Sequence, residues 1–288
     1  MDPSKGYQSG YIQGEDSAKL FWQRWCPPEQ MKGTVIIVHD LKDHGARYAE
    51  LALGLLVPAK YGVYALDLRG HGQSDGERGY VDDFDRYVRD LDAFVRHVKK
   101  EEWATAAAST PFVLGHGTGG TIAAHYATTS PPIRGVAISG AWLRQNISAL
   151  VLQGLRMADT PSREPAKATF YGLDLNDYSS DPAVVEQLRK DPLVQNGRLP
   201  ARTALQMTKA INRLREKAKN ISLPLLVLHG EGDRIAPIQG AKDVFDTAGS
   251  QSKLLRTYPG CAHDLWHEPE PNRARIRRDL VAWLNATA

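Results

Sequence analysis

The stretch Pro111–Ala127, PFVLGHGTGGTIAAHYA, reads as a buried strand, a turn crowded with glycine and a helix of small residues. In a nucleophile elbow the chain leaves a strand through a sharp, strained turn, so the positions two before and two after the nucleophile must be small. Gly115, Gly119 and Gly120 meet that demand around Gly117. The stretch therefore predicts an elbow whose nucleophile position holds a glycine and not a serine.

Two competing interpretations of glycine-rich turns in this chain are weaker. A phosphate-binding loop also follows a strand and opens a helix, but GHGTGG does not fit G-x-G-x-x-G, and GVAISGAWL from Gly135 lacks the acidic residue expected near the end of the next strand. A literal G-x-S-x-G occurs as GQSDG at Gly72–Gly76, yet the strand before it ends near Leu68 and polar residues follow it. Ser74 is therefore predicted to belong to a structural loop.

Short buried strands alternate with amphipathic helices through most of the chain. KLFWQRW from Lys19 predicts an initial antiparallel hairpin, and DDFDRYVRDLDAFVRHVKK from Asp82 is the clearest helix, with Asp82 or Asp83 as its cap. This alternation predicts an α/β fold with a mostly parallel central sheet that is flanked by helices on both faces. Further strands are predicted from Thr34, Gly62, Pro111, Gly135, Pro224 and Lys253.

The alternation stops for about seventy residues after SGAWL, where helical segments and proline-rich connectors follow. We predict a helical insertion over 144–219, which divides the core into 1–143 and 220–288. In its first helix, ISALVLQGLRMA, the apolar stripe of Ile147, Leu150, Val151 and Met157 suits a lipid pocket or a membrane surface, and packing or pocket lining is favoured. Ile147 and Val151 are the predicted substrate contacts.

An acid and a base follow the elbow in the order that such a site requires. Asp233 lies in the loop after a late strand, in LHGEGDRIAP, and His263 lies after the next strand, in YPGCAHDLWHEP. The chain order is nucleophile, acid, base, and each of the three positions follows a strand at its carboxyl end. This order predicts a catalytic triad at positions 117, 233 and 263. Glu231, Asp264 and His267 lie nearby and are less favoured as triad members; they are expected to support the site or to lie at the surface.

The segment VIIVHDLKDHGARY places His39 at a strand end and predicts an oxyanion-binding loop after it. The backbone N–H groups of Leu41 and Thr118 are the candidate oxyanion donors, and His39 and His116 are candidate substrate contacts. A metal site that uses His39 and His44 with Asp40 and Asp43 is weaker, since no third ligand type lies nearby, and no metal is predicted.

Composition narrows the function classes. The net charge is +3 over 288 residues, and the lysines and arginines are scattered, which argues against nucleic-acid binding. The N-terminus lacks an apolar signal region and no apolar run approaches the ~20 residues of a membrane span, so a cytoplasmic protein is expected. Cys26 and Cys261 are read as free thiols. No cofactor is predicted, and the oligomeric state is left open.

With these motifs together, the chain resembles the monoacylglycerol lipase and lysophospholipase branch of the α/β-hydrolase family. HDLKDHGARY resembles the family's HGxxEHxxRY, GHGTGG its GHSMGG, HGEGDRIAP its HGxxDxIxx and YPGCAH its YxGxxH. The resemblance implies an α/β-hydrolase fold, hydrolysis of monoacylglycerols, lysophospholipids or small esters, and a cap over the acyl pocket at 144–219. It also implies that GQSDG is a structural loop. Weak contact of the cap with a membrane surface is a secondary expectation.

Two positions depart from the family pattern. Asp40 stands where the family has glycine, and Gly117 stands where it has the catalytic serine. Without a nucleophile the acyl-enzyme route is closed, at a cost in turnover on the order of 10⁶. Three interpretations stay open: a deliberately inactivated esterase, a natural non-hydrolytic binding protein, and an enzyme that uses His263, held by Asp233, as a general base.

Overall fold

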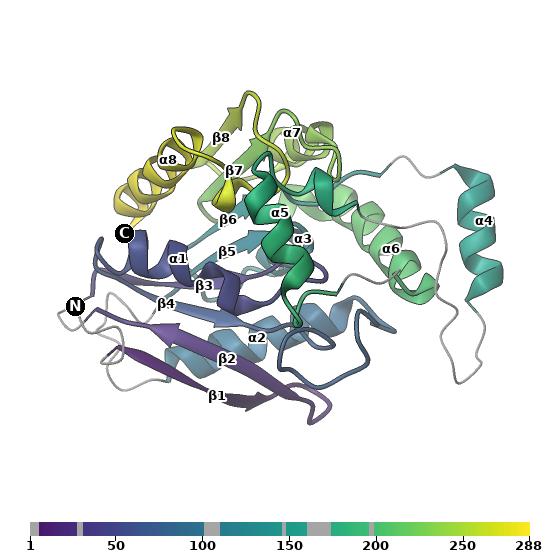
Figure 1. The fold of residues 1–288 in the computed structure, drawn as a ribbon, viewed down its shortest axis with the longest axis horizontal. Helices are drawn as coiled ribbons and strands as arrows, with labels where there is room; N and C mark the ends of the chain where they lie inside the picture. The colour runs from purple at the N-terminus through teal and green to yellow at the C-terminus, as the bar shows by residue number, and fades with distance from the viewer. Residues whose placement is uncertain (1–5, 28–30, 101–109, 146–147, 160–173, 196–198) are drawn as a thin grey trace.

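The computed structural model describes residues 6–27, 31–100, 110–145, 148–159, 174–195 and 199–288. One eight-stranded sheet runs through the molecule in the order β1-β2-β4-β3-β5-β6-β7-β8 (Figure 1). β1 pairs with β2, and β2 with β4, in antiparallel register, while the other neighbours pair in parallel. The strands are β1 Tyr7–Gln13, β2 Lys19–Trp25, β3 Gly33–Val38, β4 Tyr61–Leu66, β5 Phe112–His116, β6 Gly135–Ser139, β7 Leu225–Gly230 and β8 Lys253–Tyr258.

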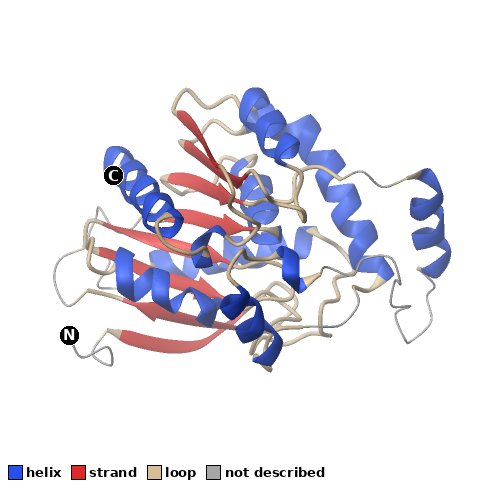
Figure 2. Ribbon diagram, turned by 45° about the horizontal axis from the view of Figure 1, so that its top comes forward, coloured by secondary structure: helices blue, strands red, loops and turns tan. Residues whose placement is uncertain are grey.

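Helices cover both faces of this sheet (Figure 2). The α-helices are α1 Ala49–Leu51, α2 Asp85–Lys99, α3 Thr118–Ala127, α4 Ala149–Ala158, α5 Pro182–Lys190, α6 Ala201–Lys217, α7 Ile238–Thr247 and α8 Asn272–Thr287. Short turns are η2 Gly45–Tyr48, η3 Ala52–Leu56, η4 Leu175–Asp177, η5 Ala218–Asn220 and η6 Leu265–His267. The α/β-hydrolase architecture predicted from the sequence, and every strand predicted from its apolar run, are confirmed.

The alternation of side chains along each strand decides which residues pack against the helices on each face of the sheet. Side chains alternate across a strand, so Ile36 of β3 joins a core with α2, α3, α6 and α7, while Val35 and Ile37 join a second core with α8 and the α1–η3 segment. All six residues of β3 are buried. A strand that is covered on both sides reads as a continuous apolar run, which is why TVIIV was recognisable in the sequence.

The predicted cap of α2 is placed differently in the structure. Phe84 is the N-cap residue and makes no side-chain capping bond. Asp83 still satisfies one of the first helical donors, because its Oδ1 accepts a hydrogen bond of 3.1 Å from the Asp85 N–H. Asp83, one of the two residues predicted to cap this helix, therefore accepts a hydrogen bond at its start, although it precedes the N-cap residue.

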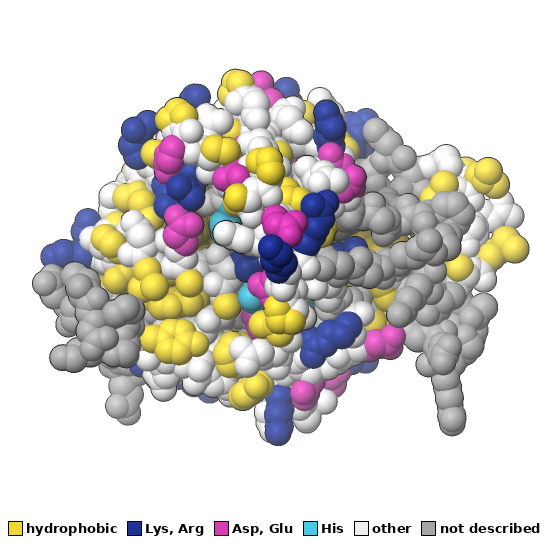
Figure 3. Space-filling view, in the orientation of Figure 1, with side chains coloured by type: hydrophobic (Ala, Val, Ile, Leu, Met, Phe, Trp, Pro, Cys, Tyr) yellow, Lys and Arg dark blue, Asp and Glu magenta, His cyan; other side chains and the backbone are white. Residues whose placement is uncertain are grey.

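Among the described residues between β6 and β7, where the sequence alternation stops, lie the helices α4, α5 and α6 and the short turns η4 and η5. The division into core and cap at 144 and 219 stays a prediction. α4 packs against α6 and lies at the outer edge of the molecule in Figure 1. Leu150 and Met157 of α4 are 78% and 73% exposed, so the packing expected for these two side chains is wrong. Figure 3 shows hydrophobic side chains on the surface at the edge of the molecule where Figure 1 places α4. Leu155 is the residue of α4 that is fully buried.

None of the helices within the described ranges is both long and apolar enough to cross a bilayer. The expected cytoplasmic location stays a prediction.

The two cysteines, Cys26 and Cys261, are free thiols, as predicted.

Ser74, the serine of the literal G-x-S-x-G, is used by the fold. Its side chain is buried, and its Oγ donates to the Asp67 carbonyl at 2.6 Å and accepts from the Phe21 N–H at 2.9 Å. The hydroxyl therefore ties the loop after β4 to strand β2, and the structural interpretation of GQSDG is confirmed by these contacts.

Ser74→Ala is expected to lower the free energy of unfolding by about 1–3 kcal/mol, because the buried Phe21 N–H loses its acceptor. Urea unfolding measures this as a lower midpoint at unchanged slope. Ser9→Ala, at an exposed position of β1, is the control and should shift the midpoint little. An unchanged midpoint for Ser74→Ala would show that the hydroxyl does not hold the loop.

Candidate active site

The chain makes a strained strand-turn-helix at Gly117. β5 ends at His116, α3 begins at Thr118, and Gly117 between them has φ +54° and ψ −120°. The turn is packed against backbone on both sides: a Cβ on Gly115 would overlap the Gly119 carbonyl, and a Cβ on Gly119 would overlap the Val38 carbonyl. The predicted elbow is therefore present, and its glycines are required by close backbone approach.

The predicted acid and base meet beside this elbow. Asp233 follows β7 and His263 follows β8, and His263 Nδ1 lies 2.8 Å from Asp233 Oδ2. The other carboxylate oxygen of Asp233 accepts the N–H groups of Ile235 and Ala236, both at 2.8 Å. Both side chains are buried, so the imidazole is held in one orientation by a carboxylate that is itself fixed by backbone.

Asp40 is a third member of this group. It lies in the loop after β3, and its Oδ2 is 3.2 Å from His263 Nε2. Its Oδ1 accepts the Thr118 N–H at 2.6 Å, and the Tyr178 hydroxyl donates to Oδ2 at 3.2 Å. The imidazole of His263 therefore lies between two buried carboxylates.

The Asp40 side chain fills the space that a nucleophile would take. A Cβ on Gly117 would overlap Oδ1 and Cγ of Asp40 and would lie 2.8 Å from the Asp40 Cβ. Such overlap cannot be tolerated by real side chains, so any residue with a Cβ at 117 needs Asp40 to move. The two departures from the family pattern, at 40 and 117, are therefore physically linked.

The charges of the group stabilise one another. Burial lowers the pKa of His263, but the charges and hydrogen bonds of Asp233 and Asp40 outweigh burial and hold this pKa well above its ordinary value. Burial raises the pKa of the Asp40 carboxyl, but the hydrogen bond and charge of His263 lower it to about 2. The pKa of Asp233 is lowered too, against the effect of burial, chiefly by the charge of His263. The metal-free group is an imidazolium between two carboxylates.

One of the two predicted oxyanion donors, the Thr118 N–H, has a partner within the protein. The Thr118 N–H donates to Asp40, and the buried Leu41 offers its carbonyl to the Tyr178 hydroxyl at 3.4 Å. The chain's own carboxylate therefore takes the Thr118 donor on which an oxyanion would depend. Use of the Thr118 N–H as an oxyanion donor stays a prediction, and it would require the Asp40 carboxylate to move away.

His39 is also placed differently from the prediction. It is fully buried, its Nε2 accepts the Leu68 N–H at 2.9 Å, and its Nδ1 lies 2.6 Å from the Asp40 carbonyl. An N–H can only donate and a carbonyl can only accept, so Nδ1 carries the proton and both ring nitrogens are used. His39 positions the Asp40 backbone, and its predicted contact with substrate stays a prediction.

His116 lies beside His263, with ring centroids 4.9 Å apart. Its Nδ1 donates to the Ser139 carbonyl at 3.0 Å. The predicted contact between His116 and substrate stays a prediction.

Of the two substrate contacts predicted in the inserted helices, Ile147 lies outside the described residues. Val151 is partly buried against an apolar cluster that contains Leu41, from the loop that carries Asp40, and Leu155 of α4.

The alternative residues belong to other contacts. Asp264 and His267 pair with each other at 2.8 Å and with Arg47, and Glu231 accepts from the Thr257 hydroxyl. The sequence also offered His39, Asp40, Asp43 and His44 as a weaker candidate metal site. In the structure His44 pairs with Asp191 at 2.9 Å. Asp43 pairs with Arg47, so His39, Asp40, Asp43 and His44 do not converge on one point.

Tyr178 is the residue of this group that the sequence did not indicate. It lies directly after η4, in the segment between β6 and β7 where no motif was found, and it is buried with its ring edge against His263 at 5.4 Å. His229 was missed as well, although it is the residue before the last in β7, the strand that precedes Asp233; its Nε2 is 3.3 Å from Asp233 Oδ2. A histidine four residues before a predicted catalytic acid was the available signal.

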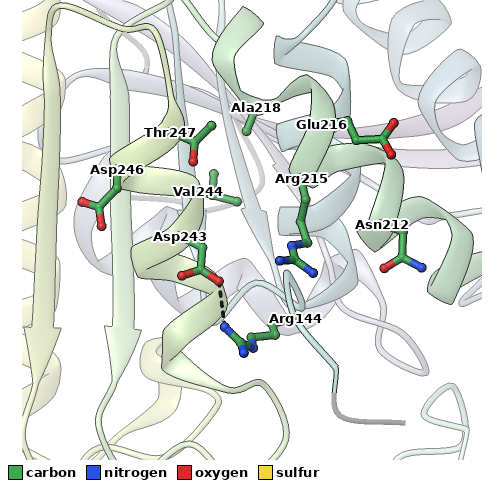
Figure 4. A pocket seen from close by; sticks show the side chains of 9 residues that line it. All are labelled: Arg144, Asn212, Arg215, Glu216, Ala218, Asp243, Val244, Asp246 and Thr247. Carbon is green, nitrogen blue, oxygen red and sulfur yellow. Dashed lines mark hydrogen bonds and ion pairs between the residues drawn. The ribbon is translucent and has the colours of Figure 1, made fainter. Parts of the chain in front are cut away.

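A separate hollow opens between α6 and α7, close to Arg144 (Figure 4). Asn212, Arg215, Asp243 and Thr247 line it, and Arg144 pairs with Asp243 at 3.0 Å. Neither Asp40 nor His263 is among its lining residues. Its mixed charges are partly paired with each other, and it is distinct from the buried Asp–His group.

Comparison with known proteins agrees with this geometry. The profile of the Hydrolase_4 family, described as serine aminopeptidase S33, matches residues 29–270. The monoacylglycerol lipase of Mycolicibacterium smegmatis is 30% identical, over 94% of this chain and 94% of its own length. The monoglyceride lipase of Rattus norvegicus is 30% identical, over 96% of this chain and 89% of its own. The crystal structure of the Paleococcus ferrophilus monoacylglycerol lipase superposes with a TM-score of 0.80 at 27% identity, covering 93% and 99% of the two chains. The fold, the elbow and these relatives together place the chain in the Hydrolase_4 family of α/β hydrolases, beside the monoacylglycerol lipases.

Proposed function

We propose that this protein binds a monoacylglycerol, a lysophospholipid or a related small ester and does not form an acyl-enzyme at residue 117. The ligand class is taken from the monoacylglycerol and monoglyceride lipases that the chain resembles over most of its length. The observation that carries the proposal is the Asp40 carboxylate, which overlaps the space of a side chain at 117 and accepts the Thr118 N–H. Acylation lacks its nucleophile, and the Thr118 N–H is not available to an oxyanion.

The general-base alternative is less favoured by the same contacts. A base must offer a lone pair to the proton that it removes. Both nitrogens of His263 face carboxylates, Nδ1 toward Asp233 and Nε2 toward Asp40, and carboxylates only accept hydrogen bonds. His263 therefore holds both protons, and its raised pKa agrees with that state.

A cap over 144–219 is part of the proposal. Val151 on α4 packs in the cluster with Leu41, which connects the inserted helices to the loop of Asp40. This placement supports Val151 as a lining residue of an acyl pocket. Leu150, on the same helix, is exposed and serves as its natural control.

Equilibrium dialysis with a radiolabelled medium-chain monoacylglycerol, kept below its micelle concentration, tests binding and turnover together. The expected result is saturable binding with the ester recovered intact. Val151→Asp is expected to weaken binding at least about tenfold, since a charge would enter an apolar cluster, whereas Leu150→Asp should bind like the native chain.

Release of free fatty acid at enzymatic rates by the native chain would overturn the proposal, and so would the absence of saturable binding for the whole ligand class. Thermal unfolding of both variants checks that they fold. Leu150→Asp also addresses the membrane expectation: unchanged co-sedimentation of this variant with liposomes would count against contact through α4.

A further inference from the structure

Asp40, His116 and His263 form a compact group of possible metal ligands. One ligand atom from each lies within 4.8 Å of the others. The three residues are 3%, 1% and 1% exposed. Two imidazoles and one carboxylate are a donor set that suits Zn²⁺ and related divalent transition metals.

Each of the three side chains is already oriented by a second partner. His116 Nδ1 donates to the Ser139 carbonyl at 3.0 Å, and His263 Nδ1 lies 2.8 Å from Asp233. Histidines that bind metal ions usually donate their other ring N–H to a carbonyl or a carboxylate, which fixes the ring and leaves one lone pair for the ion. His263 Nε2 donates to Asp40, so binding of the ion would displace that proton to solvent and leave a neutral imidazole as the ligand. Asp40 is held from outside the group by the Thr118 N–H at Oδ1 and by the Tyr178 hydroxyl at Oδ2.

An unpaired ring nitrogen of His116 is a second observation that points to a bound ion. Its Nε2 is buried and has no hydrogen-bond partner among the described residues. A buried polar atom without a partner costs about 1–3 kcal/mol, so it calls for an explanation. Since Nδ1 is protonated by its bond to Ser139, Nε2 carries a lone pair that a cation would satisfy.

The distance between two of the ligand atoms and the charge of the group both suit an ion at this place. Tetrahedral zinc with ligand bonds of about 2.0–2.2 Å brings neighbouring ligand atoms to about 3.3 Å apart. Asp40 Oδ2 and His263 Nε2 are already 3.2 Å apart. Gly117 adds no side chain at this place, and the buried carboxylates of Asp40 and Asp233 together balance a charge of +2.

We propose that Asp40, His116 and His263 bind one divalent transition-metal ion, with Zn²⁺ as the best match to the donor set. Three protein ligands leave a fourth position for water or for an oxygen of a bound ligand. The proposal does not depend on the lipid class suggested above, because it concerns only the ion.

Cobalt provides the direct test, since tetrahedral Co²⁺ gives intense visible absorption. The purified native chain is stripped with a chelator, dialysed and titrated with Co²⁺, and Zn²⁺ is then added as competitor. The expected result is an absorption that saturates at one equivalent and is abolished by Zn²⁺. Failure of the native chain to bind either ion at one equivalent would overturn the proposal.

Variants locate the ion. His116→Gln and Asp40→Asn are each expected to weaken Co²⁺ binding by about 100-fold or more. His44→Gln is the matched control, because His44 is a buried histidine that pairs with Asp191 outside the group. Unchanged binding by both ligand variants, or loss of binding in His44→Gln, would contradict the assignment.

Thermal unfolding gives a second readout that does not need activity. Zn²⁺ is expected to raise the Tm of the native chain and of His44→Gln, and to leave that of His116→Gln and Asp40→Asn unchanged. Should one ligand variant fail to fold, the other still decides the result. An equal rise of Tm in all four proteins would place the ion elsewhere.

Discussion

Asp40→Gly combined with Gly117→Ser is expected to convert the protein into an esterase that hydrolyses a short-chain chromogenic ester on the order of 10³-fold faster than the native chain. The serine supplies the nucleophile beside His263, which Asp233 already orients at 2.8 Å. Glycine at 40 removes the side chain that overlaps a Cβ at 117 and frees the Thr118 N–H. Initial rates of ester hydrolysis measure the gain.

The two single substitutions are expected to do far less than the pair. Gly117→Ser alone places its Cβ against Asp40, and Asp40→Gly alone has no nucleophile, so each should stay within about tenfold of the native rate. Asp40→Gly with Gly117→Ala is the control for general rearrangement of the loop, and it should remain inert. Full activity in Gly117→Ser alone would show that Asp40 moves aside freely and does not close the site.

Gly119→Ala is expected to lower the free energy of unfolding by about 3 kcal/mol or more. Its Cβ would overlap the Val38 carbonyl and lie near that of His39, so β3 and α3 would have to separate at the elbow. Backbone cannot turn away as a flexible side chain can. Urea unfolding, at unchanged slope, measures the loss.

Gly154→Ala provides the control for Gly119→Ala. Gly154 also lies in a helix, α4, but a Cβ there would have nothing within 4 Å. Alanine is favoured over glycine in a helix interior by about 1 kcal/mol, so this variant should be as stable as the native chain or slightly more stable. Similar midpoints for the two variants would mean that the elbow is not tightly packed.

The sequence sufficed for those parts of the protein that depend on local pattern. The apolar runs predicted β3 to β8, and the signal is clearest for β3 to β7, whose residues are buried on both faces. β2 was predicted from its alternating pattern, and β1 only as the partner strand of that hairpin. The glycines around Gly117 predicted the elbow, since only small residues allow such close backbone approach. Asp233 and His263 were recognisable because each follows a strand in the expected order, and the structure brings them to 2.8 Å.

Contacts that depend on packing between distant segments were out of reach. Asp40 was read as a change in the oxyanion loop, but its position over Gly117 follows from the approach of the β3 and β5 loops, 77 residues apart in sequence. Tyr178 comes from a segment with no motif, and its contact with Asp40 depends on how the inserted helices fold over the sheet. The spacing argument against a metal site considered only residues 39–44, whereas the three possible ligands come from the end of strand β5 and from the loops after β3 and β8.

Intact-mass spectrometry after exposure to a serine-reactive fluorophosphonate tests the central claim most directly, because it detects the covalent step without turnover. The native chain and the double variant, Asp40→Gly with Gly117→Ser, are compared with Gly117→Ser alone. The account predicts one adduct per molecule, mapped to position 117, in the double variant only. A stoichiometric adduct on the native chain, or equally fast labelling of Gly117→Ser alone, would contradict the claim that Asp40 closes the acylation site.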